Sequence, residues 1–386
     1  MDDGKTEGAL AQTERNARIV VPFPANADVA VLSLSGKTAQ RLEARDDVLV
    51  IETEKASFTL PAALIGVERR ASQLGAQASL EALNVSIVIA SPSEDKKSRI
   101  KQAAIQAGYR SAAKPVEFTI AWTDGHQTVE AAELNGYAER WIAIPAGNAR
   151  GFTTAAAVYP DGTFVPVPTS VVVRDGKTYA RINSRLNGTF LVIESAKTFA
   201  DAEHHWAKDA INEMGSRLII AGVGGDRFEP NRQITRAEFA AVLVRALGLL
   251  RPEAGQPVFG DVGQGAWYYE AVSITHLYGL INGAGDGGFK PADRMTREEA
   301  MTLIVRAMSL AGVKTEVSAP EVERELSAYR DSSQVGAWAR ESVAAALKAG
   351  IVSGRSATTL AAKEEISRAE AAVMLQRLLR QSGLLS

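Results

Sequence analysis

The sequence predicts a multidomain protein in which an all-β, sandwich-like module precedes an all-α region of three helix-loop-helix repeats. Residues 18–194 consist mainly of β-rich segments with partial alternation of apolar and polar residues. After Ser195 the apolar residues take helical spacing, and this half of the chain matches itself at fixed offsets. The 386 residues, 46% of them apolar, suffice for two or three domains with hydrophobic cores.

The overall composition excludes several classes of function. A formal charge of -2 gives no global field that would attract nucleic acid or anionic lipid, so we expect no nucleic-acid partner. The absence of cysteine excludes disulfides and thiolate metal sites. No segment approaches the roughly 20 apolar residues of a membrane span, so we expect no membrane insertion. The N-terminus lacks a signal peptide, which favours the cytosol for a complete chain but says nothing about a C-terminal piece of a longer, exported protein.

The first half is expected to contain one or two β modules after a flexible leader of residues 1–17. Three Asp-Gly pairs, which favour tight hairpin turns, lie between β-rich segments at residues 124–125, 161–162 and 175–176. Consecutive antiparallel hairpins are therefore expected over residues 18–196. Glu94 to Gln106 is a predicted helix, and a break near residues 94–110 would divide the region into two modules.

The second half, residues 197–386, contains three related segments. Counted from the tryptophan of each, a glycine follows after sixteen residues, a threonine or serine after twenty-nine, an arginine after thirty and a glutamate after thirty-two. The tryptophans are Trp206, Trp267 and Trp338, the glycines are Gly222, Gly283 and Gly354, and an aromatic-x-Asp before each tryptophan supplies Asp201, Asp261 and Asp331. The repeats thus run over residues 199–249, 259–310 and 329–381.

One glycine-rich stretch has the spacing of a dinucleotide-binding loop, Gly283-x-Gly285-x-x-Gly288. Such a loop needs a strand before it and a helix directly after it. Here a helical segment comes first, and the corresponding loops of the other repeats lack the glycines. Asp286 also lacks the alternating carboxylates of a calcium loop. The stretch is therefore predicted to be a connecting loop, and we expect neither a cofactor nor a metal.

The T/S-R-x-E tetrads predict helix starts. A hydroxyl followed three residues later by a glutamate matches the capping box, in which both side chains bond backbone N–H groups. The predicted capping pairs are Thr235 with Glu238, Thr296 with Glu299 and Ser367 with Glu370.

Capping does not require the arginine inside each tetrad. A cation in the first turn is mildly unfavourable against the helix dipole, whereas a guanidinium beside free N–H groups is a good anion receptor. Arg236, Arg297 and Arg368 are therefore predicted anion-binding residues. Arg245, Arg306 and Arg377 lie nine residues further on, on another face of the helix, and a structural or solvated role is expected for them.

The repeated tryptophans and aspartates each have alternative interpretations. Each tryptophan is either a core anchor for the first helix or a platform for the face of a sugar. Each aspartate either caps the first helix, pairs with an arginine or accepts sugar hydroxyls.

These motifs resemble the S-layer homology repeat. The first repeat carries F-x-D, W-A, the loop glycine, F-x-P and I-T-R-A-E-F-A, and the resemblance extends over roughly the C-terminal half. It implies a helical, pseudo-threefold unit with grooves between repeats. It also implies a cell-surface protein held non-covalently on an acidic secondary cell-wall polysaccharide, often one with pyruvylated sugars. The resemblance assigns glycan binding to the arginines of the tetrads, and also to the repeated aspartates, tryptophans and loop glycines.

The repeats depart from this pattern at a few positions. The first repeat has Leu218 where the others have Gly279 and Gly350, and the third has Leu360 and Ala362 in place of Phe and Pro. The third repeat also lost its loop glycines and follows a longer linker. These departures argue against ligand binding at the groove of the third repeat more than at the others. The alternative is that the third repeat mainly closes the ring of three.

Three functions are compatible with the sequence. The first is a non-catalytic wall anchor for a larger surface protein. The second is an enzyme or the tethered C-terminal part of an exoenzyme, although the four histidines have no H-E-x-x-H spacing and no G-x-S-x-G occurs. The third is an adhesion or assembly module whose β half self-associates. We expect a non-enzymatic anchor.

Overall fold

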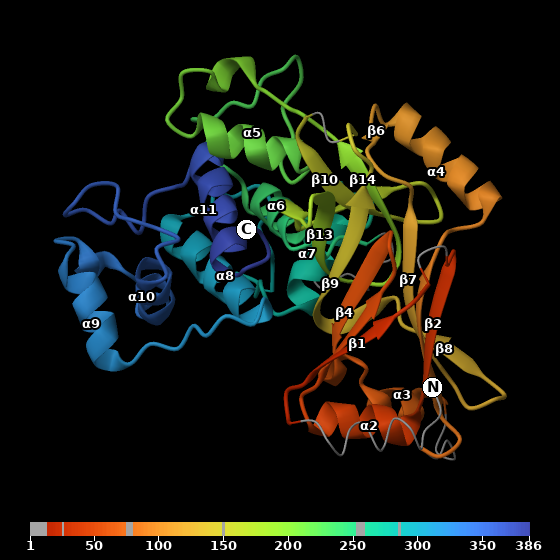
Figure 1. Ribbon diagram of the computed structural model, residues 1–386. Helices are drawn as coiled ribbons and strands as arrows, with labels where there is room; N and C mark the ends of the chain where they lie inside the picture. Colours follow the sequence, from red (N-terminus) through yellow and green to blue (C-terminus); the bar gives the residue numbers. More distant parts are fainter. Residues whose placement is uncertain (1–13, 25–26, 75–79, 149–150, 252–258, 285–286) are drawn as a thin grey trace. The chain divides into compact units, whose positions relative to one another are not determined.

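The computed structural model describes residues 14–24, 27–74, 80–148, 151–251, 259–284 and 287–386. The chain divides into two compact units, Met1–Ser195 and Ala196–Ser386, which we call unit 1 and unit 2 (Figure 1). Unit 1 is rich in β-strands and unit 2 is helical. Most of the leader expected at residues 1–17 lies outside the described residues.

Unit 1 contains two β-sheets. In the first sheet the strand order is β1 (Arg18–Pro22), β3 (Val48–Glu52), β4 (Ala56–Pro61), β9 (Glu133–Ile144), β13 (Lys177–Leu186) and β12 (Thr169–Arg174). In the second it is β11 (Phe164–Val167), β10 (Thr153–Val158), β14 (Gly188–Glu194), β7 (Val116–Thr123), β5 (Asn84–Ala90) and β2 (Val29–Ser35). Two short strands, β6 (Arg110–Ser111) and β8 (Thr128–Glu130), pair with β14 and β7.

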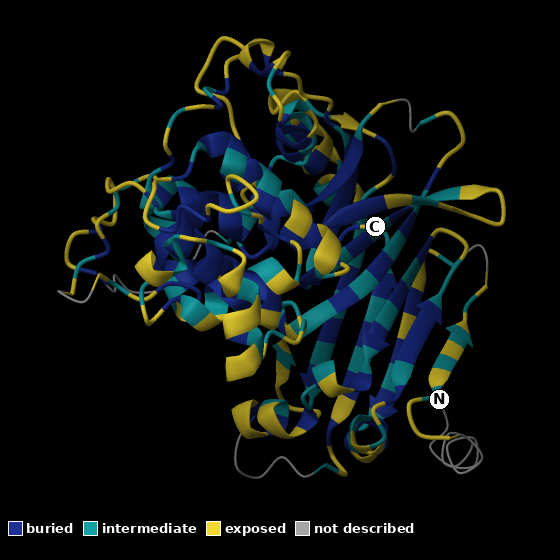
Figure 2. Cartoon of the chain, turned by 90° about the vertical axis from the view of Figure 1, so that its left-hand side faces the viewer, coloured by how far each residue is buried: buried dark blue, intermediate teal, exposed yellow. Residues whose placement is uncertain are grey.

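The two sheets share one hydrophobic core. Along β4, β5, β7 and β9 buried residues largely alternate with more exposed ones, as Figure 2 shows for the strands. Phe58 of one sheet meets Phe118 of the other edge-on, with ring centroids 5.6 Å apart. The guanidinium of the fully buried Arg140 lies 4.5 Å from the Phe58 centroid, and burial lowers its pKa to about 9.

The expected chain of consecutive hairpins is wrong for part of unit 1. β1 pairs with β3 in parallel, and β4–β9 and β9–β13 join strands that are not consecutive. The three Asp-Gly pairs do lie in hairpin turns, between β7 and β8, β10 and β11, and β12 and β13. α4 (Glu94–Gln106) has the predicted bounds. It does not separate two β modules, because β5 and β7, which precede and follow it in the chain, pair with each other.

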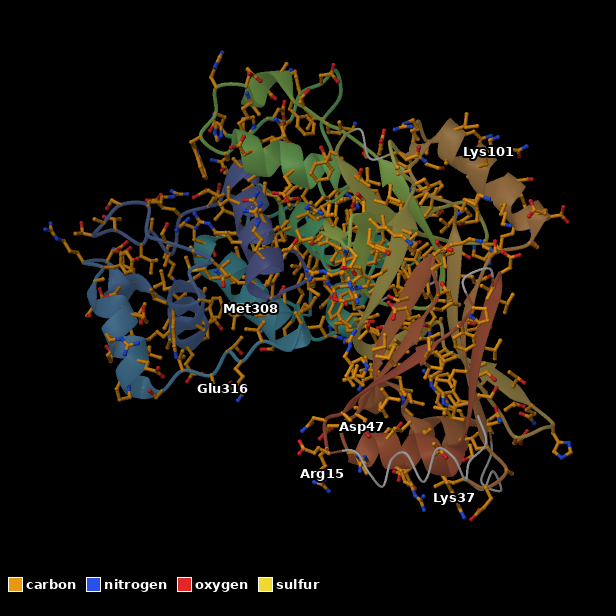
Figure 3. All side chains as sticks on the ribbon, in the orientation of Figure 1. Arg15, Lys37, Asp47, Lys101, Met308 and Glu316 are labelled. Atoms are coloured by element: carbon orange, nitrogen blue, oxygen red, sulfur yellow. The ribbon has the colours of Figure 1, made fainter. Side chains whose placement is uncertain are left out.

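Two further helices in unit 1 were not predicted. α2 (Gly36–Ala44) starts at the cap Ser35, whose hydroxyl accepts the Thr38 N–H, and α3 (Val67–Leu74) follows the 3-10 turn η1 (Ala62–Leu64). Their apolar faces pack on one end of the core. Next to α2, the buried Asp47 accepts the Ala17 N–H at 2.8 Å, and this bond holds the residue before β1 in place. Asp47, labelled in Figure 3, also pairs with Arg45.

Each repeat of unit 2 is a pair of helices, with α5 (Lys208–Ser216), α7 (Tyr269–Leu277) or α10 (Arg340–Lys348) first and α6 (Arg236–Ala246), α8 (Arg297–Leu310) or α11 (Arg368–Gln381) second. The 3-10 turns η2 (Ala200–Ala202) and η3 (Ser332–Gln334) precede the first and third pairs, and α9 (Ala319–Ser327) occupies the longer linker. Leu218 has a left-handed φ of 62°, where the other repeats have Gly279 and Gly350. A leucine there carries strain that glycine avoids.

The three repeats close on one another in a cycle. The Ile234 N–H donates to the Ile366 carbonyl at 3.1 Å, the Ile366 N–H to the Met295 carbonyl at 2.9 Å, and the Met295 N–H to the Ile234 carbonyl at 3.1 Å. All three residues are buried. Because each repeat gives one bond and receives one, unit 2 is a closed, pseudo-threefold arrangement.

Candidate functional site

A capping box begins the second helix of every repeat. The hydroxyls of Thr235, Thr296 and Ser367 accept the N–H of the glutamate three residues on. Each glutamate accepts the cap N–H in return, at 2.9 Å for Glu238 and 2.8 Å for Glu299 and Glu370. The first arginine of each helix is thereby set at a fixed position, directly after the cap.

These arginines reach across to the next repeat of the cycle. The Arg297 Nε donates to the Leu360 carbonyl at 3.0 Å, Nη1 donates to Glu370 at 2.9 Å, and Nη2 donates to the Ser353 carbonyl at 2.9 Å. The same pattern joins Arg236 to Phe289 and Glu299, and Arg368 to Phe228, Ala221 and Glu238. The capping glutamate thus serves its own helix and the arginine of another repeat.

Two of these arginines are almost completely buried. Arg297 is 3% exposed and Arg368 8%. Burial lowers the pKa of both guanidinium groups, and the charges of Glu370 and Glu238 oppose that change. Their main structural role is to join the repeats, since most of their donors are used within the protein.

The repeated aspartates hold the loop before the second helix. Asp261 accepts the N–H groups of Phe289 at 2.8 Å and Lys290 at 2.7 Å, one on each carboxylate oxygen. The second residue of each held pair has a left-handed φ, 57° at Lys290. The equivalent bonds run from Phe228 and Glu229 to Asp201, and from Leu360 and Ala361 to Asp331. The N-caps of the first helices are Ala207, Tyr268 and Ala339, so these carboxylates do not cap them. The charges of Asp331 and Arg297 interact, as do those of Asp201 and Arg368.

Each repeated glycine lies where a side chain would collide with the protein itself. A Cβ on Gly222 would come within 2.7 Å of the Arg227 carbonyl, and one on Gly283 within 2.9 Å of the Gly288 carbonyl. A Cβ on Gly354 would lie 2.7 Å from the Thr359 carbonyl. The glycines are therefore required by the tight loop, whether or not a ligand is bound. Gly285 and Asp286 of the same loop in the second repeat lie outside the described residues.

The three tryptophans are on the surface. Trp206 is 68% exposed, Trp267 65% and Trp338 60%, so the core-anchor interpretation is wrong. Each precedes the first helix of its repeat by two residues. Exposed aromatic faces of this size are available for contact with a ligand.

A pocket of about 480 Å³ lies beside Trp206 and combines residues of all three repeats. The first repeat contributes Trp206, the second contributes Arg297, and the loop and second helix of the third contribute the remaining lining. From the third repeat the lining residues are Ile351, Val352, Ser353, Gly354, Arg355, Ser367, Glu370, Val373, Met374 and Arg377. Three arginines face one carboxylate, so the pocket has an excess of positive charge.

Two of these arginines were not assigned to a site from the sequence. Arg355 bonds the Glu365 carbonyl at 2.7 Å and lies 3.3 Å from Glu370, and it also pairs with Glu364. Valine and alanine occupy its position in the other repeats, so no repeat signal marks it. Arg377 does belong to a repeated set, and its Nη1 donates to the Ile351 carbonyl at 3.2 Å. It lines the pocket, whereas Arg368 of the same helix bonds the Phe228 and Ala221 carbonyls of the first repeat.

Comparison with known proteins identifies these repeats. A family model described as the S-layer homology domain matches residues 198–240, 258–301 and 328–372. Unit 2 contains three S-layer homology domains, and we call it the S-layer homology unit. Each match begins at the start of a repeat and ends within its second helix, and the pocket has lining residues from all three S-layer homology domains.

The curated relatives include both enzymes and surface-layer proteins. An amylopullulanase of Thermoanaerobacterium thermosulfurigenes is 36% identical over 50% of this chain and 10% of its own length. The surface-layer 125 kDa protein of Lysinibacillus sphaericus is 32% identical over 45% of this chain and 14% of its own. The S-layer protein sap of Bacillus anthracis is 28% identical over 50% and 22%. The chain thus matches less than a quarter of each relative's length.

The described ranges contain neither a cluster of metal-ligating side chains nor a candidate membrane span. No group of three or more histidine, aspartate or glutamate side chains in the described ranges is placed to hold a metal ion. Within the same ranges no helix has the length and apolar character needed to cross a bilayer.

Acid is expected to destabilise the S-layer homology unit. Burial alone would raise the pKa of Glu370, but the Ser367 N–H, Arg355 and Arg297 outweigh it, so the pKa lies below the usual 4.5. The pKa of Glu238 is also below its usual value, because Arg232, the Thr235 N–H and Arg368 outweigh the effect of burial. A carboxylate whose folded pKa is lowered contributes stability above its unfolded pKa, and that stability is lost as the pH falls through the folded value.

The free energy of unfolding of unit 2 is therefore expected to decline as the pH falls below about 4.5. Urea unfolding at a series of pH values, followed by the helical circular dichroism signal, measures this decline. Glu370→Gln removes one of the titrating groups and should give a shallower acid dependence. An identical dependence in the variant would contradict the assignment.

Proposed function

We propose that the S-layer homology unit binds an acidic cell-wall polysaccharide in the pocket beside Trp206. The observation that carries this proposal is the combination of an exposed tryptophan with an excess of arginine in one pocket formed by three repeats. A volume of about 480 Å³ is within the range of pockets that hold a small ligand or a sugar residue with its substituent.

The chemistry of the lining favours a carboxylate-bearing sugar, such as one with a ketal-linked pyruvate. The indole of Trp206 offers a flat apolar face for a pyranose ring. Arg355 and Arg377 carry guanidinium donors at the pocket wall, and a guanidinium binds a carboxylate with paired, charge-assisted bonds. Glu370 is already paired with Arg297, so its charge is offset before the ligand arrives.

The tetrad arginines have an indirect part in this proposal. Arg297 lines the pocket but has bonds to protein from all three of its nitrogens, so it mainly holds the Ser353 and Leu360 carbonyls in place. By the cyclic arrangement, Trp267 corresponds to a site with Gly222 and Arg368, and Trp338 to one with Gly283 and Arg236. We propose weaker or accessory binding at these two positions. The aspartates then act by keeping the loops in shape.

Binding of this kind would make the chain a non-covalent anchor at the cell surface. The relatives' names, an amylopullulanase and surface-layer proteins, fit an anchoring unit that serves proteins of different activities.

Trp206→Ala is expected to weaken binding of the full chain to purified wall polysaccharide about tenfold, because the ring loses its apolar platform. Trp267→Ala and Trp338→Ala are matched controls, since these tryptophans are equally exposed. They should have smaller effects. Sedimentation with the polysaccharide, measured over a concentration series, gives the affinities. Unchanged affinity for Trp206→Ala would reject the pocket as the binding site.

A further inference from the structure

The two ends of the β-sandwich in unit 1 are built differently. At one end α2, η1 and α3 pack Ala39, Leu42, Val67 and Leu74 against the core. At the other end, where the β3–β4 and β12–β13 turns meet the ends of β2, β5 and β7, the structure has a cavity of about 770 Å³. We propose that this cavity binds a monoanionic amphiphile, meaning a ligand with an apolar body and a single acidic group.

The floor of the cavity is apolar and comes from both sheets. Ile142 and Ile144 of β9, Ala56 of β4 and Ile89 of β5 line it, and all four are at most 5% exposed to solvent. Half-buried Val116 continues this surface. An apolar ligand body would fill the cavity and gain packing contacts with this surface, without placing a polar group against it.

The rim carries charges that are nearly all paired. Lys55 pairs with Asp28 at 3.6 Å, Lys177 with Glu54 at 3.4 Å, and Lys97 with Glu94 at 2.7 Å. Lys114 is the exception, because its ammonium group has no ion-pair partner among the described residues. It lies close enough to Glu94 to contribute to lowering the pKa of that carboxyl group, behind the nearer Lys97.

This pattern selects among ligand classes. None of the described residues that line the cavity is aromatic, so it lacks the stacking surface that sugars use. The rim carries four ammonium groups and three carboxylates, and three of the ammonium groups are already paired with those carboxylates. The net charge is thus a single positive one, which a ligand with one negative charge would balance at Lys114. The combination of an apolar floor with one free cation therefore fits an apolar molecule that carries one carboxylate, sulfonate or similar group.

The test is a fluorescence titration of the full chain with 8-anilinonaphthalene-1-sulfonate, a monoanionic aromatic probe. Lys114→Gln is expected to weaken probe binding about tenfold, because the charge-assisted contact is lost. Lys101→Gln, on the exposed face of α4, is the matched control and should bind like the parent chain (Figure 3). Ala146→Trp, which places a large ring at the cavity wall, should also block the probe.

Competition separates the two parts of the proposal. Dodecanoate should displace the probe about tenfold better than dodecyl maltoside, which has an alkyl chain of similar length and no charge. Equal displacement would overturn the requirement for an anion. Probe binding that survives both Lys114→Gln and Ala146→Trp in folded protein, as judged by circular dichroism, would overturn the site.

Discussion

Replacing Arg297 by alanine is expected to lower the free energy of unfolding of unit 2 by about 3–5 kcal/mol, the usual cost of breaking a buried ion pair. Arg297 is the most buried of the three tetrad arginines that carry the cycle, and it joins the second repeat to the third through Glu370, Leu360 and Ser353. Its loss leaves two carbonyls and a half-buried carboxylate without that donor. The effect should extend to the whole unit, because the repeats close on one another.

Arg294→Ala is the matched control for this variant. Arg294 lies three residues earlier and is exposed. Its Nη1 donates a hydrogen bond to the Gln233 carbonyl. Its removal should change stability by less than about 1 kcal/mol. Urea unfolding of both full-length variants, followed by the helical circular dichroism signal, compares them. If Arg297→Ala unfolds at the same urea concentration as Arg294→Ala, the arginine does not hold the repeats together.

The double variant Arg355→Gln/Arg377→Gln is expected to weaken binding to the acidic polysaccharide by at least about a hundredfold. Each charge-assisted bond contributes about 1.5–3 kcal/mol, so losing two of them has a larger effect than any single change at the pocket. Both side chains are partly exposed and lie at the pocket wall, so the fold should tolerate glutamine better there than at Arg297.

Arg340→Gln is a suitable control for the loss of charge. Arg340 is also in the third repeat and pairs with Glu323 of α9, away from the pocket lining. Calorimetric titration should show parental affinity for this variant. Equal affinity of the double variant and the parent chain would mean that these two arginines do not bind the ligand.

These two experiments separate structural from direct effects on binding. A loss of binding in Arg297→Ala alone would be ambiguous, since the variant also releases the Ser353 carbonyl beside the pocket. Trp206 is exposed, and the side chains of Arg355 and Arg377 bond residues of their own repeat, so their variants should not release one repeat from another.

The sequence predicted well those features that depend on neighbouring residues. The capping pairs need only four consecutive residues, and α4 has a local cap and a clear helical segment. The repeats could be found because the same offsets occur three times. By contrast, α2 and α3 were missed because their short segments lie between strongly β-rich ones, and their reason for being helical is that they cover the end of a core.

The partners of the arginines could not be found from spacing. Arg297 and Glu370 are 73 residues apart, and Arg368 and Phe228 are 140 apart. From the sequence alone, an arginine at the start of a helix is predicted to bind an external anion. In the structure a glutamate from another repeat pairs with it. Arg355 was missed for a different reason. An arginine occurs at this position in one repeat only, in the loop that departs most from the repeat pattern. The third repeat departs most from the repeat pattern, yet it contributes most of the residues that line the pocket.

The most direct test of the account is calorimetric titration of the full chain with purified wall polysaccharide, before and after chemical removal of its pyruvate. The account predicts binding that is lost or greatly weakened when the pyruvate is removed, and that is weakened by Trp206→Ala. Equal binding to both preparations would contradict the role of the arginines in reading an acidic group. Absence of binding to either would contradict the anchor itself.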